Sequence, residues 1–241
     1  MRRLPVYLLL DTSGSMFGEP IEAVKNGVQV LVSTLRQDPY ALETAYLSII
    51  TFDSTAQQVV PLTELSTFQQ PNIEANGCTA LGEALALLAA KVDVEVTKTT
   101  AEVKGDWKPL VFIMTDGEPT DDAAEGLEKL KNNNWYKAAI KVAIAIGDDA
   151  EKSVLEEFAG NSEAVLTVHN IDQLKKIIRY VSVTASKVAS KTTSVGKDAP
   201  ETKNEENIQN LKKVIQDDPT LSGIDTGSST ANAGTDDWTG W

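Results

Sequence analysis

Oxygen-bearing side chains follow the first apolar run of this chain at alternate positions. In VYLLLDTSGSM (residues 6–16), five apolar residues end at Asp11, and hydroxyl groups follow at Ser13 and Ser15. A carboxylate and two hydroxyls without a neighbouring histidine or lysine are poorly suited to acid–base catalysis. Oxygen atoms directed at one point are instead the ligands that a hard divalent cation prefers.

Two further segments carry oxygen donors at the end of an apolar run or before a helical pattern. PLVFIM (109–114) is followed by Thr115, Asp116 and Gly117, and Thr79 lies within NGCTALGEAL (76–85). Because the carboxyl ends of parallel strands share one edge of a sheet, we predict that these groups meet there. The predicted site suits Mg²⁺ and, by extension, Mn²⁺. Its members are Asp11, Ser13, Ser15, Thr79 and Asp116.

Strand-like and helix-like patterns alternate along the first three quarters of the chain. Strands are predicted at 6–10, 45–52, 109–114 and 141–147, with an antiparallel edge strand at 56–62 that contains Pro61. Helices are predicted at 19–37, 81–92, 121–132, 151–160 and 172–188. This alternation predicts a doubly wound α/β fold, with a mostly parallel six-stranded sheet and helices on both faces.

The pattern changes near residue 189, where apolar residues become sparse. We predict one folded domain over residues 1–188 and a polar, flexible tail over 189–241, with a short amphipathic helix at 207–216. Serine and threonine residues in the tail are candidate phosphorylation sites.

Composition narrows the classes of partner. The formal net charge of −13 repels nucleic-acid phosphates and anionic lipid headgroups, so neither is an expected partner. The single cysteine, Cys78, fits a cytoplasmic protein. Arg2 and Arg3 precede an apolar run too short for a secretory signal, and we expect a strand there instead.

DTSGSM, the threonine of GCTALGEAL and TDGEPTD (115–121) together resemble the metal-ion-dependent adhesion site of the von Willebrand factor A domain family. The resemblance covers residues 4–188 and implies that Ser13, Ser15 and Thr79 bind the metal directly. Asp11 and Asp116 would ligate it or hold its waters. It also implies a non-enzymatic module that binds an Asp or Glu of a protein partner through the metal. Gly77, Glu118 and Asp121 are the predicted partner contacts.

In this chain the A-domain pattern is compact, starts close to the N-terminus and contains TDGEPTD. This arrangement further resembles bacterial A-domain proteins of tellurite-resistance and chemical-stress operons. That resemblance implies a cytoplasmic protein and, as partners, a protein kinase and a phosphatase acting on the tail. The chain lacks the cysteine-rich zinc module of some members of that group.

Simpler interpretations stand beside these. DTSGS alone could cap the following helix, and Asp116 could be a turn residue. A Mg²⁺-dependent phosphohydrolase using Asp11 is the alternative function. The haloacid-dehalogenase type needs a second aspartate where this chain has Ser13, and no GxxxxGK[ST] phosphate-binding loop is present.

Overall fold

The computed structural model describes residues 2–178 except 101, 103, 171 and 175. The predictions for the tail at 189–241, the helix at 207–216 and the 179–188 part of the last helix lie outside these residues. Within the described part of the chain, no helix has the length and apolar character needed to cross a membrane.

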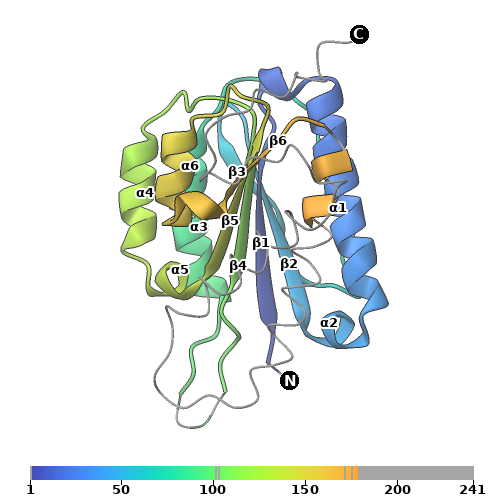
Figure 1. Ribbon diagram of the computed structural model, residues 1–241. Helices are drawn as coiled ribbons and strands as arrows, with labels where there is room; N and C mark the ends of the chain where they lie inside the picture. Colours follow the sequence, from blue (N-terminus) through green and yellow to red (C-terminus); the bar gives the residue numbers. More distant parts are fainter. Residues whose placement is uncertain (1, 101, 103, 171, 175, 179–241) are drawn as a thin grey trace.

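Six strands form one sheet in the order β3-β2-β1-β4-β5-β6 (Figure 1). Every pair of neighbours is parallel except β2 and β3, which are antiparallel. This confirms the predicted fold class, including the antiparallel edge strand. The strands are β1 (Leu4–Asp11), β2 (Ala45–Phe52), β3 (Ala56–Glu64), β4 (Leu110–Thr115), β5 (Ile140–Ile146) and β6 (Val165–Val168).

Helices cover both faces of the sheet (Figure 1). They are α1 (Glu19–Gln37), α2 (Pro39–Thr44), α3 (Leu81–Glu95), α4 (Ala123–Lys131), α5 (Asn134–Ala138) and α6 (Lys152–Ala159), with 3₁₀ turns η1 (Gly14–Met16) and η2 (Ser162–Ala164).

The short helices α2 and α5 were not predicted, because neither is long enough to show apolar periodicity. Both are started by local caps: Asp38 accepts hydrogen bonds from the backbone of Tyr40 and Ala41, and Asn133 accepts one from Tyr136.

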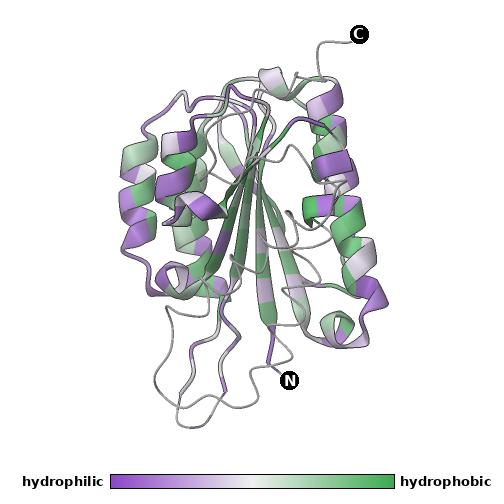
Figure 2. Ribbon diagram, viewed as in Figure 1, coloured by the Kyte–Doolittle hydropathy of each residue, from purple (hydrophilic) through white to green (hydrophobic). Residues whose placement is uncertain are grey.

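The alternation of side chains along β1 divides the core into two layers. Leu4, Val6, Leu8 and Leu10 belong to the layer with α1, whereas Tyr7 and Leu9 belong to the layer with α3, α4, α5 and α6. The sheet is accordingly green along most of its length in Figure 2, while the helices carry purple residues on their outer faces. Because both faces of the sheet are buried, its polar strand-end residues can reach solvent only at the edges.

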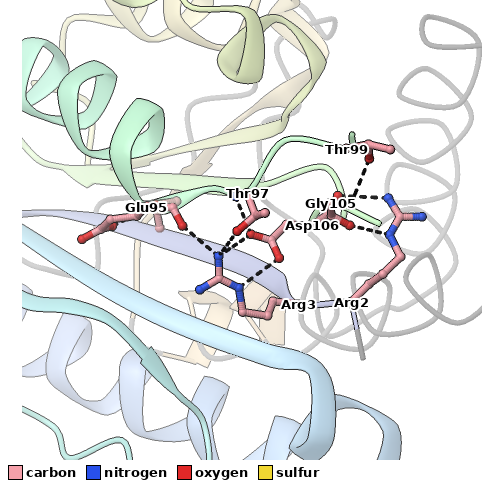
Figure 3. Close-up of polar contacts among 8 residues, drawn as sticks. Arg2, Arg3, Glu95, Thr97, Thr99, Gly105 and Asp106 are labelled. Carbon is pink, nitrogen blue, oxygen red and sulfur yellow. Dashed lines mark hydrogen bonds and ion pairs between the residues drawn. The ribbon is translucent and has the colours of Figure 1, made fainter. Parts of the chain in front are cut away.

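A polar cluster fastens the start of β1 to the loop between α3 and β4 (Figure 3). Arg3 forms an ion pair with Asp106 at 2.5 Å and donates to the backbone oxygen of Glu95. Arg2 donates to the Gly105 oxygen, and its guanidinium lies 3.7 Å from the centre of the Trp107 ring. Asp106 is only 5% exposed, so this ion pair is largely shielded from water. The cluster stabilises the end of the sheet opposite the predicted site.

Candidate metal centre

The predicted site residues lie at the edge of the sheet where β1 and β4 end, shown at the top of Figure 1. Ser13 Oγ is 2.9 Å from Ser15 Oγ, and Ser15 donates a 2.8 Å hydrogen bond to Asp116 Oδ1. A Cβ atom added at Gly117 would lie 3.7 Å from Ser15 Oγ and 3.8 Å from Thr79 Oγ1. The three loops therefore bring their oxygen atoms around one small space.

Asp11 anchors this cluster from inside the protein. Its side chain is fully buried, and it accepts hydrogen bonds from the Ser13 backbone N–H at 2.8 Å and from the Thr115 hydroxyl. Burial, with a small contribution from the nearby carboxylate of Asp116, raises the pKa of Asp11 to about 6 against the opposing effect of its hydrogen bonds. The negative charge of Asp11 is therefore destabilising in the absence of a cation.

Asp116, at the solvent side of the cluster, also has a raised pKa. Burial raises its pKa, and the carboxylate of Asp149 adds to the increase, whereas the hydrogen bond from Ser15 opposes it. In the described part of the chain, the salt bridges include none between a lysine or arginine and either Asp11 or Asp116. A cation placed between the two carboxylates would relieve their mutual repulsion.

The members of the cluster differ in their exposure to solvent. Asp11, Ser13 and Thr79 are buried, Asp116 is half-buried and Ser15 is exposed. An ion held here would consequently keep one side open to an external ligand, beside Ser15.

Backbone hydrogen bonds hold the loops in register. Asn76 donates to the Thr12 oxygen at 2.8 Å, and Gly14 donates to the Gly77 oxygen at 3.0 Å. The Thr79 N–H donates to the Thr120 hydroxyl, and the Thr120 N–H donates back to the Thr79 oxygen. These contacts join all three donor segments before any ligand arrives, which is the preorganisation that a binding site requires.

The two simpler interpretations do not account for this geometry. The residue that precedes the first turn of α1 is Gly18, so none of the DTSGS side chains caps that helix. The side chain of Asp116 accepts from Ser15, across the edge of the sheet, which goes beyond what a local turn requires.

The three predicted partner contacts occupy different surroundings. Gly77 has a φ of +75°, and a Cβ there would lie 2.3 Å from Ser54 Oγ, so glycine is needed to shape the loop. Asp121 accepts hydrogen bonds from the backbone of Gly82 and Glu83 and thereby caps α3. Glu118 is exposed beside the cluster. Their roles in binding a partner stay predictions.

A depression of about 590 Å³ extends from Ser15, Asp116 and Gly117 to the loop between β5 and α6. Besides Asp116 and Glu118, its charged lining residues are Asp148, Asp149, Glu151 and Lys152. Sequence reasoning missed this wall, although GDDAE directly follows the apolar run of β5 and was a visible signal. It also missed the role of Thr115 as a donor to Asp11 and that of Thr120 as the partner of Thr79.

The donor set fits a hard divalent cation. It combines two carboxylates with three hydroxyls. Separately, the described residues contain no group of three or more His, Cys, Asp or Glu side chains that could hold a metal by themselves. Carboxylates and neutral oxygens without imidazole or thiolate favour Mg²⁺ or Mn²⁺ over softer ions.

Comparison with known sequences gives one family. The model of the von Willebrand factor type A domain matches residues 6–179. An uncharacterized protein of Synechocystis sp. is 30% identical over 174 residues, which is 69% of this chain and 38% of that protein. The collagen alpha-6(VI) chain of Mus musculus is 23% identical over 187 residues, or 75% of this chain and 8% of the collagen. The chain thus spans well under half the length of either relative.

Solved structures show the same fold. A von Willebrand factor type A protein from Catenulispora acidiphila has a TM-score of 0.57 and 19% identity, covering 77% of this chain and 43% of that one. Proximal thread matrix protein 1 from the mussel byssus has a TM-score of 0.56 and 20% identity. It is described with zinc in its metal-ion-dependent adhesion site (MIDAS) motif. Its alignment covers 77% of this chain and 46% of the mussel protein.

Proposed function

Since this chain belongs to the von Willebrand factor type A domain family, we propose that it is a non-enzymatic, metal-dependent protein-binding module. Ser13, Ser15 and Thr79 would bind Mg²⁺ or Mn²⁺ directly, and Asp11 and Asp116 would ligate it or hold its waters. The bound ion supplies a positive field that attracts an Asp or Glu side chain of a protein partner.

One observation carries this proposal: two repelling carboxylates, Asp11 and Asp116, lie against three hydroxyls at a solvent-facing edge. Two carboxylates and three hydroxyls do not fill the six positions of a divalent ion, and the positive field of the ion is strongest at the position that they leave open. The exposure of Ser15 leaves the open position toward solvent, where a partner carboxylate can reach it.

The burial of Asp11 argues against the phosphohydrolase alternative. Its side chain is fully buried, so the phosphorus atom of a substrate has no path to this carboxylate, whereas the cluster opens to solvent at Ser15. Ser13 also cannot replace the second aspartate as an acid–base group. Sustained turnover of an aryl phosphate with Mg²⁺, abolished in Asp11→Asn, would support the enzyme instead.

We further propose, from the motif resemblance, that the module acts in the cytoplasm in a bacterial response to tellurite or chemical stress. A kinase and a phosphatase would then act on the tail after residue 189. Loss of tellurite resistance after deletion of the gene, and restoration by wild type but not by Thr79→Ala, would support this setting. Equal rescue by both would separate the stress role from the metal site.

The metal site itself is tested by calorimetric titration of the chelator-treated protein with Mg²⁺, Mn²⁺ and Zn²⁺. Zinc is included because the mussel protein is described with zinc in its motif. Thr79→Ala should weaken binding at least tenfold, whereas Thr79→Ser, which keeps the hydroxyl, should retain most of it. Ser33→Ala, an exposed hydroxyl on α1, is the control. Unchanged affinity in Thr79→Ala would refute the ligand assignment.

Partner binding is tested with affinity capture from native lysate in Mg²⁺ and in chelator, followed by calorimetry with the purified partner. We expect binding that requires both the metal and one acidic side chain of the partner. Equal affinity with and without metal would show that the site does not bridge the two proteins.

A further inference from the structure

The two sides of the metal centre differ in chemistry. On the side of β5 and α6, the depression that starts at Ser15 and Asp116 has an acidic wall. Its carboxylates are Glu118, Asp148, Asp149 and Glu151, and Lys152 is the one cation among its lining residues. The Nζ atom of Lys152 lies 3.9 Å from Oδ1 of Asp148, and its single positive charge offsets only part of the negative charge of the wall. A bound divalent ion would balance Asp11 and Asp116 and would leave the wall negative.

The segment that leads from η1 into α1 carries an exposed aromatic residue, Phe17, which is not among the residues that line the depression. Phe17 follows Ser15 by two positions and is 80% exposed, although a ring of this size usually gains stability from burial. Because Phe17 is two positions from Ser15, their Cα atoms lie within about 8 Å of each other by chain geometry. Aromatic residues are enriched among the side chains that anchor protein interfaces.

We propose that the partner is an extended peptide segment whose metal-binding Asp or Glu has a Lys or Arg on one side and an apolar residue on the other. The basic residue lies in the depression against Asp148, Asp149 and Glu151, and the apolar residue packs on Phe17. This inference rests on the proposed function and specifies its ligand. It follows from charge complementarity on one side and from the exposed ring on the other.

The size of the depression agrees with this occupant. A volume of about 590 Å³ accommodates more than the single carboxylate that the metal needs, and it leaves room for a long basic side chain with its backbone. A broadly acidic ligand would be repelled by the same wall, including Asp149, which already repels Asp116. The acidity of the wall therefore selects among the acidic segments that could reach the metal.

An array of synthetic nonapeptides tests the inference without a known partner. Each peptide has a central Glu in a Gly-Ser background, and Lys, Glu, Phe or Ser is placed at each flanking position in turn. Retention of the labelled chain is measured with saturating Mg²⁺ and with chelator. We expect Lys on one flank to raise Mg²⁺-dependent retention about three- to tenfold over Glu, with Phe favoured on the other flank. Central Gln should abolish retention.

Two pairs of variants connect the selectivity to named residues. Asp148→Lys combined with Asp149→Lys should remove or invert the preference for Lys, whereas Glu128→Lys combined with Glu156→Lys, an equal change of charge on exposed faces of α4 and α6, should not. Phe17→Ser should remove the preference for Phe, whereas Val94→Ser, at a residue 85% exposed on α3, should not. Mg²⁺ affinity is measured for each variant, so that binding is compared at full occupancy.

The outcomes separate this inference from the proposed function. If retention ignores Mg²⁺ or the central Glu, the metal-bridging function fails and the inference fails with it. If both are required but the flanks show no preference, or the preference survives Asp148→Lys/Asp149→Lys, the function stands and the inference is wrong. Self-association of the chain in Mg²⁺ that competes with every peptide would name a second copy as the ligand and would also overturn it.

Discussion

Replacing Asp11 with Asn should stabilise the metal-free protein while removing its metal affinity. Burial raises the pKa of Asp11 from 3.8 to about 6, which means that ionising this carboxylate costs the folded state about 3 kcal/mol at neutral pH. Asn is neutral and nearly isosteric. Its oxygen can accept from the Ser13 N–H, and its amide can donate to the Thr115 hydroxyl, so both hydrogen-bonded contacts of Asp11 can persist.

The sign of the pH dependence follows from proton linkage. Because the folded-state pKa of Asp11 lies above the unfolded value, the folded protein binds more protons between pH 4 and pH 6. The ionisation penalty is therefore fully present above about pH 7 and disappears as the pH falls below 4. In chelator at pH 7.5, the free energy of unfolding of Asp11→Asn should exceed that of wild type by about 1–3 kcal/mol, a rise of roughly 2–12 °C in Tm. The difference should shrink steadily toward pH 4.

Thermal and urea unfolding of wild type and Asp11→Asn in chelator, measured from pH 4 to pH 8, provides the assay. Asp93→Asn, at an exposed carboxylate on α3, is the matched control and should change little. Added Mg²⁺ should stabilise wild type and leave Asp11→Asn unchanged. A folded Asp11→Asn protein that is no more stable than wild type at pH 7.5 would refute the reasoning, because the buried charge would then cost nothing.

Three further predictions concern the supports of the site. Thr120→Val removes the acceptor of the Thr79 N–H, and calorimetry should show a three- to tenfold loss of Mg²⁺ affinity with an intact fold. Unchanged affinity would show that Thr120 does not position Thr79. Gly77→Ala forces an alanine into a φ of +75° against Ser54, so urea unfolding should show a loss of about 1–3 kcal/mol, and wild-type stability would contradict the strain argument. Arg3→Met leaves Asp106 without its ion-pair partner and should lower the free energy of unfolding by about 2–4 kcal/mol. Mg²⁺ affinity should be retained because this cluster lies at the far end of the sheet, and a parallel loss of affinity would show that the two ends are coupled.

Sequence patterns are sufficient to predict the fold class and the identity of the clustered side chains. Buried parallel strands appear in the sequence as apolar runs, and such runs end where the sheet meets solvent, so the sequence alone assigns Asp11 and Asp116 to one edge. Thr79 is assigned to the same edge from its position just before a helical pattern, and the family resemblance adds the expectation that it binds the metal directly.

The groups that support or surround these residues depend on contacts between distant parts of the chain, which local sequence patterns do not predict. The pairing of Thr79 with Thr120 joins residues 41 positions apart, and the contact of Thr115 with Asp11 joins residues 104 positions apart. The acidic wall depends on the placement of β5 next to β4, which brings Asp148 and Asp149 beside Asp116. Asp121 likewise looks like a rim residue in sequence, but its carboxylate caps α3. Local patterns encode which residues end a strand, whereas strand order and loop packing determine what those ends face.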